Sequence, residues 1–420
     1  MKLSAGDRAM LEGRRGEAAH LAMRIVVAMA AVTGADRLLD VASAHVDGCL
    51  YHGQASLDFA GRLVEGGARV SIPTTLNVGS VDLLHPELNR GDPETTDRGR
   101  RLMDLYSSMG CRPTWTCAPY QLPDRPSFGQ HVAWAESNAV VFANSVLGAR
   151  TDRYGDFIDI CAAITGRAPA SGLHLDGNRA AEVLFRMSGV PKALLAEDVL
   201  YPVLGHLVGL EAGRMVPVIE GLPGSVTEDR LKALGAAAAS SGAVGLFHAV
   251  GLTPEARSLD EALAGREPRR VVEVTPSRLA RARDSLSTAW GDRLDAVSVG
   301  TPHFSLEEFA RLTPLLERTA LSPGVAFFVS TSRHILAEVE ARGWLEVYRR
   351  AGVKLVVDTC TYVTSILAPA HRVVMTNSAK WAYYAPGNVG VDVVFGSLEE
   401  CVRSAAEGRI RRDEGLWQRG

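Results

Sequence analysis

The sequence has little of the features that mark several specialised classes of protein. Only 6 of its 420 residues are cysteine, and its formal net charge is −3. So few cysteines, in a chain that opens without an apolar leader segment, argue against a disulfide framework and predict reduced thiols in a cytoplasmic protein. The nearly balanced charge gives no reason to expect nucleic acid as a partner.

Long hydrophobic runs are also missing. The longest uncharged run includes residues 234–252, which are mostly Ala and Gly and are interrupted by Ser240, Ser241 and Gly242. A helix end followed by a buried strand explains this run better than a membrane span does. We therefore expect no membrane association.

Familiar catalytic signatures are absent as well. The chain contains no G-x-x-x-x-G-K-[ST] phosphate loop, no G-x-S-x-G nucleophile elbow, no H-E-x-x-H, no C-x-x-C and no dinucleotide fingerprint. These absences argue against the enzyme classes that the motifs define.

The chain does have a regular alternation of short β-branched runs with helical segments. Buried strands are expected at residues 68–73, 244–250, 269–275, 294–300, 325–330, 353–360, 372–378 and 390–397. Nearly continuous apolar strands separated by helices predict parallel sheets covered on both faces, so the expected fold class is α/β, with several α/β/α units. A capping box at Ser4 and Asp7 predicts a long amphipathic helix that runs to about Val32.

Polar and charged side chains follow four of the expected strands. They are Thr74, Thr75, Asn77, Ser332, Arg333, Cys360, Asn377 and Lys380. In open parallel sheets ligands bind beyond the carboxyl ends of the strands, where helix N-termini favour anions. We therefore predict one crevice that binds a small molecule carrying a carboxylate. The alternative is that these residues only cap the helices that follow.

Residues 134–156 form a second dense polar stretch. At helical spacing Ser137, Asn144 and Arg150 share one face, which predicts a pocket lining or hydrogen bonds across a core. Arg150 and Arg153 carry the planar guanidinium groups that clamp carboxylates well. A solvated helix face is the competing interpretation.

Two cysteines stand out by their position. Cys117 lies in the irregular connection 109–124, which also holds three prolines, and Cys360 ends an expected strand beside Asp358. A thiolate ligand is one interpretation of both. A small buried apolar residue is the other.

Taken together, eight motifs resemble the aconitase X family. They are SAHVDG (43–48), IPTTLN (72–77), TCAPY (116–120), SNAVVFANSVLGARTDR (137–153), GLHLDGNR (172–179), TPHFSLEEFARL (301–312), VVDTC (356–360) and TNSAKWAYYAPG (376–387). They follow the family's order and extend over nearly the whole chain.

The resemblance implies an aconitase-like fold, with three α/β/α units in residues 1–420 around a central cleft and with internal boundaries that the sequence does not define. It implies a hydro-lyase. Bacterial members resemble cis-3-hydroxy-L-proline dehydratases, and archaeal members resemble mevalonate 5-phosphate dehydratases. The family's smaller swivel domain, expected to supply a catalytic serine, is not evident in this chain, so a small partner chain that carries it is expected.

The resemblance also implies iron or an iron–sulfur cluster. Two family cysteine ligands correspond to Cys117 and Cys360, but Thr301 replaces a third. Because thiolates hold the irons of such clusters, a hydroxyl is a poor substitute. A differently ligated cluster, a mononuclear iron and no metal all stay open. A compensating ligand would be Cys111, Cys49, a histidine or the substrate.

Dehydration of a β-hydroxy acid needs a base at the α-carbon, a carboxylate clamp and help for the departing hydroxide, which iron can supply as a Lewis acid. The candidates for proton handling or orientation are Ser43, His45 and Glu136, and His45 is equally explained as a buried core histidine. The expected metal-side residues are Cys117, Cys360 and Thr301. The expected substrate contacts are Thr74, Thr75, Asn77, Ser137, Asn144, Arg150, Arg153, Ser332, Arg333, Asn377 and Lys380.

Three functions follow from these expectations. The first is iron-assisted dehydration of a small hydroxy acid, with cis-3-hydroxy-L-proline going to a pyrroline carboxylate as the leading case. The second is a divergent enzyme of the aconitase superfamily, with or without an iron–sulfur cluster, that acts in a specialised pathway as an isomerase or as a dehydratase of another hydroxy acid. The third is a non-catalytic binding relic, against which the retained Arg150, Arg333 and Lys380 argue.

Overall fold

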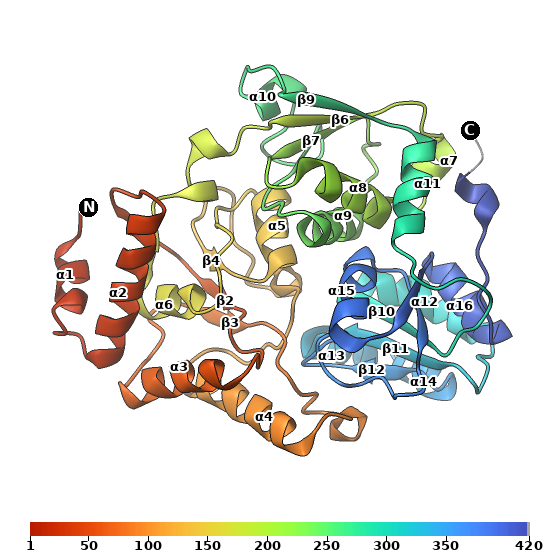
Figure 1. The fold of residues 1–420 in the computed structure, drawn as a ribbon, viewed down its shortest axis with the longest axis horizontal. Coiled ribbons are helices and arrows are strands. Elements are labelled where there is room, and N and C mark those ends of the chain that lie inside the picture. The colour runs from red at the N-terminus through yellow and green to blue at the C-terminus, as the bar shows by residue number, and fades with distance from the viewer. Residues whose placement is uncertain (418–420) are drawn as a thin grey trace. The chain divides into compact units, whose positions relative to one another are not determined.

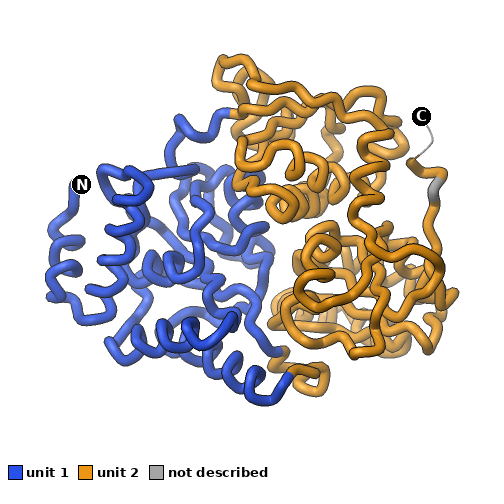
Figure 2. Tube along the Cα trace, viewed as in Figure 1, with its two compact units in different colours: residues 1–81, 92–180 blue, residues 82–91, 181–420 orange. Residues whose placement is uncertain are grey.

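The computed structural model describes residues 1–417. Contacts divide the chain into two compact units, which Figure 2 draws in different colours. Unit 1 comprises residues 1–81 and 92–180, and unit 2 comprises residues 82–91 and 181–420. The short segment 82–91 therefore belongs to unit 2, although unit 1 flanks it on both sides in the sequence.

Unit 1 is built on small sheets covered by helices. Strands β3, β2 and β4 pair in parallel in that order, and β1 pairs with β5 in an antiparallel ladder. Its elements are α1 (Ala5–Leu11), α2 (Glu17–Val32), β1 (Leu38–Asp40), β2 (Ala44–Val46), α3 (Gln54–Glu65), β3 (Thr74–Leu76), α4 (Pro93–Ser108), η2 (Pro119–Gln121), β4 (Ala133–Trp134), α5 (Ser137–Ser145), α6 (Ile158–Thr165), β5 (Arg167–Pro169), η3 (Gly172–His174) and η4 (Asp176–Asn178).

The N-terminal helical region consists of two helices (Figure 1). Ser4 caps α1 with both halves of a capping box, as predicted. The chain then passes through Gly13 at φ +76° and Gly16 at φ +98° before α2 begins. Such backbone angles break an α-helix. The single long helix that we predicted is therefore wrong in its middle and right at both ends.

The first sheet of unit 2 has the strand order β8, β7, β6, β9, and all its pairs are parallel. Figure 1 shows α8 and α9 lying together beside β7. The elements are η1 (Pro86–Leu88) from the separate segment, then β6 (Val183–Met187), α7 (Lys192–Leu195), α8 (Leu200–Ala212), β7 (Pro217–Glu220), α9 (Glu228–Ser241), β8 (His248–Ala249), α10 (Leu259–Leu263), β9 (Arg270–Val274) and α11 (Pro276–Ser285).

The second sheet of unit 2 has the order β12, β11, β10, β13, β14, again all parallel. Its core includes Phe304, Phe309, Phe327 and Tyr348, all buried. The elements are β10 (Ala296–Phe304), α12 (Leu306–Glu317), β11 (Ala326–Thr331), α13 (Arg333–Ala341), α14 (Leu345–Arg350), β12 (Lys354–Val356), β13 (Val373–Thr376), α15 (Ala379–Val389), β14 (Asp392–Phe395), α16 (Leu398–Glu407) and η5 (Glu414–Trp417).

Strand β10 changes its register against β11. Val299 pairs with Val329, but the next paired residue on β10 is Phe304. Gly300 lies inside the shift at φ +90°, and a Cβ there would come within 2.2 Å of the carbonyl oxygen of Ser330. Only glycine fits such a position. The bulge removes residues 301–303 from the regular ladder, as bulges beside functional sites commonly do.

The predicted α/β class with mainly parallel sheets is confirmed, since within residues 1–417 only the β1–β5 ladder is antiparallel. The expected helix end and buried strand in residues 234–252 are α9 and β8, although β8 is shorter than predicted. The strand predicted at 68–73 is wrong, because β3 begins after it and Val70 donates its backbone N–H to Met109 instead of to a strand.

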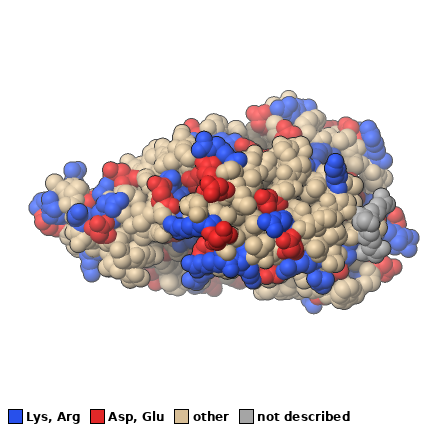
Figure 3. Space-filling model, turned by 90° about the horizontal axis from the view of Figure 1, so that it is seen from above, with Lys and Arg blue, Asp and Glu red and all other residues tan. Residues whose placement is uncertain are grey.

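Two surface properties bear on partners. Among residues 1–417, no helix combines the length and the apolar character that crossing a bilayer requires. On the face shown in Figure 3, basic and acidic side chains are interspersed and form no continuous area of one sign.

Candidate active site

A cavity in unit 2 brings together predicted site residues from separate strand ends. Thr301, Asn377 and Lys380 all line it. Its walls also include residues from the N-terminal parts of α9, α12 and α16. Helix N-termini carry partial positive charge, so the cavity favours an anionic group on its ligand.

The N-terminus of α15 is built against the bulge of β10. Ser378 accepts the backbone N–H of Trp381 at 3.0 Å and donates its hydroxyl to the carbonyl oxygen of Thr301. Thr301 is 5% exposed and Lys380 is 3% exposed. Within residues 1–417 the hydroxyl of Thr301 has no hydrogen-bond partner. A buried hydroxyl of this kind in a cavity wall can be satisfied by a ligand.

Lys232 holds a buried ionic cluster in the same cavity. Its ammonium lies 2.9 Å from Asp229 and also pairs with Glu308. Ser305, the N-cap of α12, donates to Asp229 at 2.6 Å. Burial opposes the charge on Lys232, but the two carboxylates raise its pKa. Burial also disfavours the charged form of Glu308 and raises the pKa of its carboxyl to about 7, although Lys232 opposes this shift. This lysine is therefore already neutralised by protein carboxylates.

Charges in the cavity are nearly balanced. The acidic lining residues are Glu197, Asp198, Asp229, Glu308 and Glu399, and the basic ones are Arg230, Lys232, Arg311 and Lys380. Arg230 lies 2.7 Å from Asp198, which Arg311 also contacts. A ligand with both a positive and a negative group suits such a cavity better than a doubly charged anion does.

Two side chains of types that can bind a metal ion lie near each other in unit 2. A ring nitrogen of His303 and the sulfur of Cys360 are within 4.8 Å of each other, and both side chains are buried. The Nε2 of His303 lies 3.2 Å from the carbonyl oxygen of Thr359. Burial lowers the pKa of His303 to about 4, so the imidazole is neutral at ordinary pH. An imidazole and a thiol are donors that suit a transition metal.

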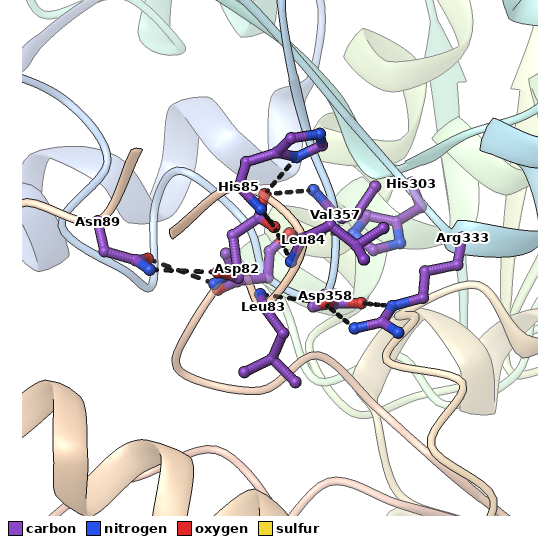
Figure 4. Close-up of polar contacts among 10 residues, drawn as sticks. Asp82, Leu83, Leu84, His85, Asn89, His303, Arg333, Val357 and Asp358 are labelled. Atoms are coloured by element: carbon purple, nitrogen blue, oxygen red, sulfur yellow. Dashed lines mark hydrogen bonds and ion pairs between the residues drawn. The ribbon is translucent and has the colours of Figure 1, made fainter. Parts of the chain in front are cut away.

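Arg333, predicted as a substrate contact, is held by Asp358. Its guanidinium makes two hydrogen bonds of 2.6 Å to the carboxylate (Figure 4). Ser332 is buried and caps α13 through the N–H of Ile335. Asp358 stands at φ +61°, a conformation that few non-glycine residues adopt.

Segment 82–91 is bound to the same region by carboxylates. Asp82 is fully buried and accepts the backbone N–H of Val357 at 2.9 Å (Figure 4). Asp358 accepts the N–H of Leu83 at 3.1 Å. These bonds tie the segment to the end of β12, just before Cys360.

His45 lies on β2 beside β3 in unit 1. Its Nδ1 is 2.8 Å from the hydroxyl of Thr75, and its side chain is fully buried. Burial lowers the pKa of His45 to about 3, against a smaller opposing effect of a hydrogen bond with the Thr116 backbone. Thr74 donates to the carbonyl of Ile72 at 2.9 Å. The partly buried Ser43 accepts a backbone hydrogen bond from β4 through its carbonyl.

Glu136 is the N-cap of α5. Its carboxylate accepts the N–H of Ala139 at 2.8 Å and the hydroxyl of Ser137 at 3.2 Å, and Asn138 donates to it as well. The side chain is 4% exposed. Both of its oxygens therefore serve the start of this helix.

The shared face predicted for Ser137, Asn144 and Arg150 is wrong, because α5 ends at Ser145. Asn144 does bond across the core, one of the two roles that we predicted, and accepts a hydrogen bond from Arg179 at 3.0 Å. Arg150 pairs with Asp176 at 2.5 Å.

The remaining predicted site residues of unit 1 differ from one another in their burial and in their hydrogen-bond partners. Arg153 is exposed. Asn77 is buried and donates to Asp47, whose pKa is raised to about 7 by burial and by neighbouring carboxylates. Cys117 is buried in the turn before η2, and its carbonyl accepts from Asn138 at 2.7 Å.

Sequence reasoning did not single out His303, Asp358 or the cluster around Lys232. A signal existed for His303, since it stands two residues after the position where the family cysteine is replaced. No local signal pointed to Lys232, because its partners come from one turn of its own helix and from the distant α12.

Comparisons with known proteins agree with this architecture. Sequence profiles of the aconitase X first, second and third domains match residues 1–177, 181–284 and 294–407. A crystal structure of Thermococcus kodakaraensis aconitase X in its holo form superposes with a TM-score of 0.85 at 35% identity, covering 96% of this chain and 100% of that one.

Curated relatives share the similarity over nearly the whole chain. A cis-3-hydroxy-L-proline dehydratase of Pseudomonas aeruginosa is 46% identical over 99% of this chain and 72% of its own length. One of Hypocrea jecorina is 42% identical over 97% of this chain and 69% of its own length. The phosphomevalonate dehydratase large subunit of Thermococcus kodakarensis is 37% identical over 96% of this chain and 100% of its own length. All are dehydratases, which agrees with the predicted hydro-lyase class, and this chain belongs to the aconitase X family.

Proposed function

We propose that this protein dehydrates cis-3-hydroxy-L-proline to a pyrroline carboxylate. The balanced charge of the cavity in unit 2 is the observation that carries the choice of substrate. Five carboxylates and four cationic side chains line it. Hydroxyproline is a zwitterion, whereas a phosphorylated hydroxy acid brings a carboxylate and a doubly charged phosphate. Two such anions need an excess of cations, which this cavity lacks.

The cavity offers partners for both ends of the zwitterion. Lys380 and the N-terminus of α15 suit the carboxylate, and the hydroxyl of Thr301 adds a donor beside them. The acidic side chains of the cavity lining suit the ring ammonium. We place Asn377 with the carboxylate partners, and Arg333 at the edge of the site, oriented by Asp358.

The reaction breaks a Cα–H bond and a Cβ–O bond and releases water. The resulting enamine becomes the imine by moving one proton, so no oxidant or reductant is consumed. Iron, when bound, supplies Lewis-acid help for the departing hydroxide. We propose Cys360 and Cys117 as its thiolate ligands; for Cys117 the support is the family resemblance alone.

Residues of unit 1 have orienting roles in this proposal. Because its pKa is about 3, His45 is neutral and can accept or relay a proton only weakly at neutral pH. Glu136 holds the start of α5, so we assign it, with Ser43, to orientation of neighbouring groups. Thr74, Thr75, Asn77, Ser137 and Asn144 contribute to the same scaffold, and Arg150 and Arg153 stay candidate carboxylate contacts.

We further propose that a small partner chain carrying the swivel domain completes the enzyme. Relatives named large subunits support this, since the Thermococcus one is matched over 100% of its length. The single-chain alternative corresponds to the Pseudomonas relative, of which 72% is matched. We place the enzyme in the cytoplasm, in accordance with its six buried cysteines.

The test is a substrate comparison on the complete, anaerobically purified enzyme loaded with iron. NMR should show cis-3-hydroxy-L-proline converted to the pyrroline carboxylate, and Lys380→Gln should strongly slow this conversion at substrate concentrations below KM. Absence of turnover, with the partner chain and iron both present, would overturn the proposal.

A second candidate is dehydration of mevalonate 5-phosphate. The near end-to-end match with archaeal large subunits favours it. Turnover of mevalonate 5-phosphate without turnover of hydroxyproline would establish this second function. If the enzyme converts neither substrate, the candidate functions that remain are the divergent enzyme acting on another hydroxy acid and the non-catalytic binding relic.

A further inference from the structure

We propose that His303 is a metal ligand in this chain and takes the place of the thiolate that Thr301 cannot supply. With Cys360 it forms a nitrogen–sulfur donor pair that favours a single metal ion over an all-thiolate iron–sulfur cluster. This inference deepens the proposed function, because it specifies the metal side of the same site.

Geometry is the first support. The two donor atoms lie within 4.8 Å. Two such atoms bound to one ion at ordinary ligand distances are separated by about 3.6 Å. A small side-chain adjustment therefore brings both to one metal.

The backbone places His303 there. The bulge at Gly300 moves the following residues out of register with β11. Cys360 follows β12, which is joined to β10 through β11. Both residues thus come from the same end of one rigid parallel sheet, where donor positions cost little to hold in place.

The hydrogen bond of His303 selects a suitable tautomer. A carbonyl oxygen only accepts, so the Nε2 that lies 3.2 Å from the Thr359 carbonyl carries the hydrogen. In the neutral ring the lone pair is then on Nδ1. Metal-binding histidines characteristically donate their other ring N–H to a carbonyl or carboxylate. A neutral imidazole also needs no deprotonation before it binds metal.

Neighbouring groups fit less well as the replacement ligand. Thr301 lines the cavity beside Lys380, and its hydroxyl is a weak neutral donor. Asp358 gives both carboxylate oxygens to Arg333. Figure 4 draws no hydrogen bond between His303 and this pair. The donor set of unit 2 therefore fits a mononuclear site.

The test measures metal binding by the complete protein without substrate. Metal-free protein is titrated with Co²⁺ or Fe²⁺ alone, and stoichiometry is read by elemental analysis and by the thiolate-to-metal absorption band. We expect one ion per chain, an at least tenfold weaker affinity in His303→Gln, and loss of the thiolate band in Cys360→Ser. His371→Gln, at a histidine beside Phe328 on the same sheet, is the matched control and should leave the affinity unchanged.

Two further measurements keep the inference falsifiable if His303→Gln folds poorly. Pulsed EPR on unaltered protein labelled with ¹⁵N-histidine should show a directly bound nitrogen. Thr301→Cys should gain the brown absorbance of an iron–sulfur cluster after anaerobic reconstitution. An all-sulfur cluster in the unaltered protein, or metal affinity that is the same in His303→Gln, would overturn the inference. Neither measurement depends on substrate turnover. A wrong substrate assignment therefore affects only the turnover assay and can be distinguished from a wrong metal ligand.

Discussion

Two hydrogen bonds of 2.6 Å join the guanidinium of Arg333 to the carboxylate of Asp358. The aspartate side chain is completely buried, whereas that of Arg333 is 39% exposed. Asp358 also has a left-handed backbone, at φ +61°. Backbone of this kind costs on the order of 1 kcal/mol or more and persists where the surroundings hold it. The pair therefore stabilises the turn that leads to Cys360.

Replacing Arg333 by Met should destabilise the protein by about 1–3 kcal/mol, because a buried carboxylate loses its counter-ion; the partial exposure of Arg333 keeps the cost below that of a fully buried pair. Burial already raises the pKa of Asp358 in the folded protein, and it rises further once Arg333 no longer opposes this shift. A raised acid pKa removes stability as pH increases, so the loss should be larger near pH 8 than near pH 5. Thermal unfolding at both pH values measures it.

The control for this prediction is the double variant Arg333→Met, Asp358→Asn. It should recover most of the lost stability at the higher pH, since the amide can be buried without charge. A loss that is the same at both pH values and is not relieved by the second substitution would contradict the assigned role of the pair.

Gly300→Ala should destabilise the protein by about 3 kcal/mol or more, because the new Cβ would meet the carbonyl of Ser330 at 2.2 Å. Activity should fall with it, since the bulge positions Thr301 and His303. Chemical denaturation provides the measurement. Gly387→Ala in α15, where a Cβ would meet nothing within 4 Å, is the matched control and should be neutral or stabilising. Unchanged stability in Gly300→Ala would show that the bulge is dispensable.

Two buried lysines of one cavity should respond differently to the same substitution. Lys232→Gln leaves Asp229 and Glu308 without their shared cation, so unfolding should become easier by about 3 kcal/mol. Lys380→Gln should instead lower kcat/KM by about a hundredfold, mainly through KM, with a smaller change in melting temperature. Steady-state kinetics and thermal unfolding of both variants test the contrast. If Lys232→Gln and Lys380→Gln changed stability and activity to the same extent, the assignment of Lys232 as structural and of Lys380 as substrate-binding would be wrong.

The carboxyl of Asp47 should make unit 1 less stable as pH rises. Burial and nearby carboxylates raise its pKa from 3.8 to about 7 in the folded protein. Between these values only the unfolded chain releases the proton, so stability is lost as pH increases through this window. The loss is on the order of 4 kcal/mol for one such group titrating alone.

Asp47→Asn removes that titration. Its stability relative to the unaltered protein should therefore improve steadily between about pH 4 and pH 7. Asp58→Asn, at an exposed position, controls for the change in net charge. Parallel stability curves for Asp47→Asn and the unaltered protein would show that Asp47 is ionised in the fold.

Local signals in the sequence were read correctly in several places. The capping box at Ser4 is present, and the hydroxyl residues after strands cap helices, as Ser332 and Ser378 do. These features depend on residues a few positions apart, so the sequence alone carries them. Ser332 was also expected near a ligand, as were Thr301, Asn377 and Lys380, and the last three line one cavity.

Other expectations failed where an element ended sooner than its pattern suggested. Arg150 follows α5 instead of continuing it, and its partner is Asp176 from η4. The long N-terminal helix is divided at Gly13 and Gly16. Glycine conformation and loop partners depend on what packs around them, which periodicity does not describe.

By itself the sequence determined the α/β class, the parallel sheets and the membership in a family. Apolar periodicity and short motifs depend on residues close together in the chain, so they can be recognised without the tertiary structure. The tertiary structure alone decided which charged groups neutralise one another and which face a ligand. Lys232 and Lys380 look alike in the sequence, yet one is held by two buried carboxylates and the other begins a helix at the cavity wall. The environment of a charge is set by residues distant in the chain, and only folding brings them within Coulombic reach.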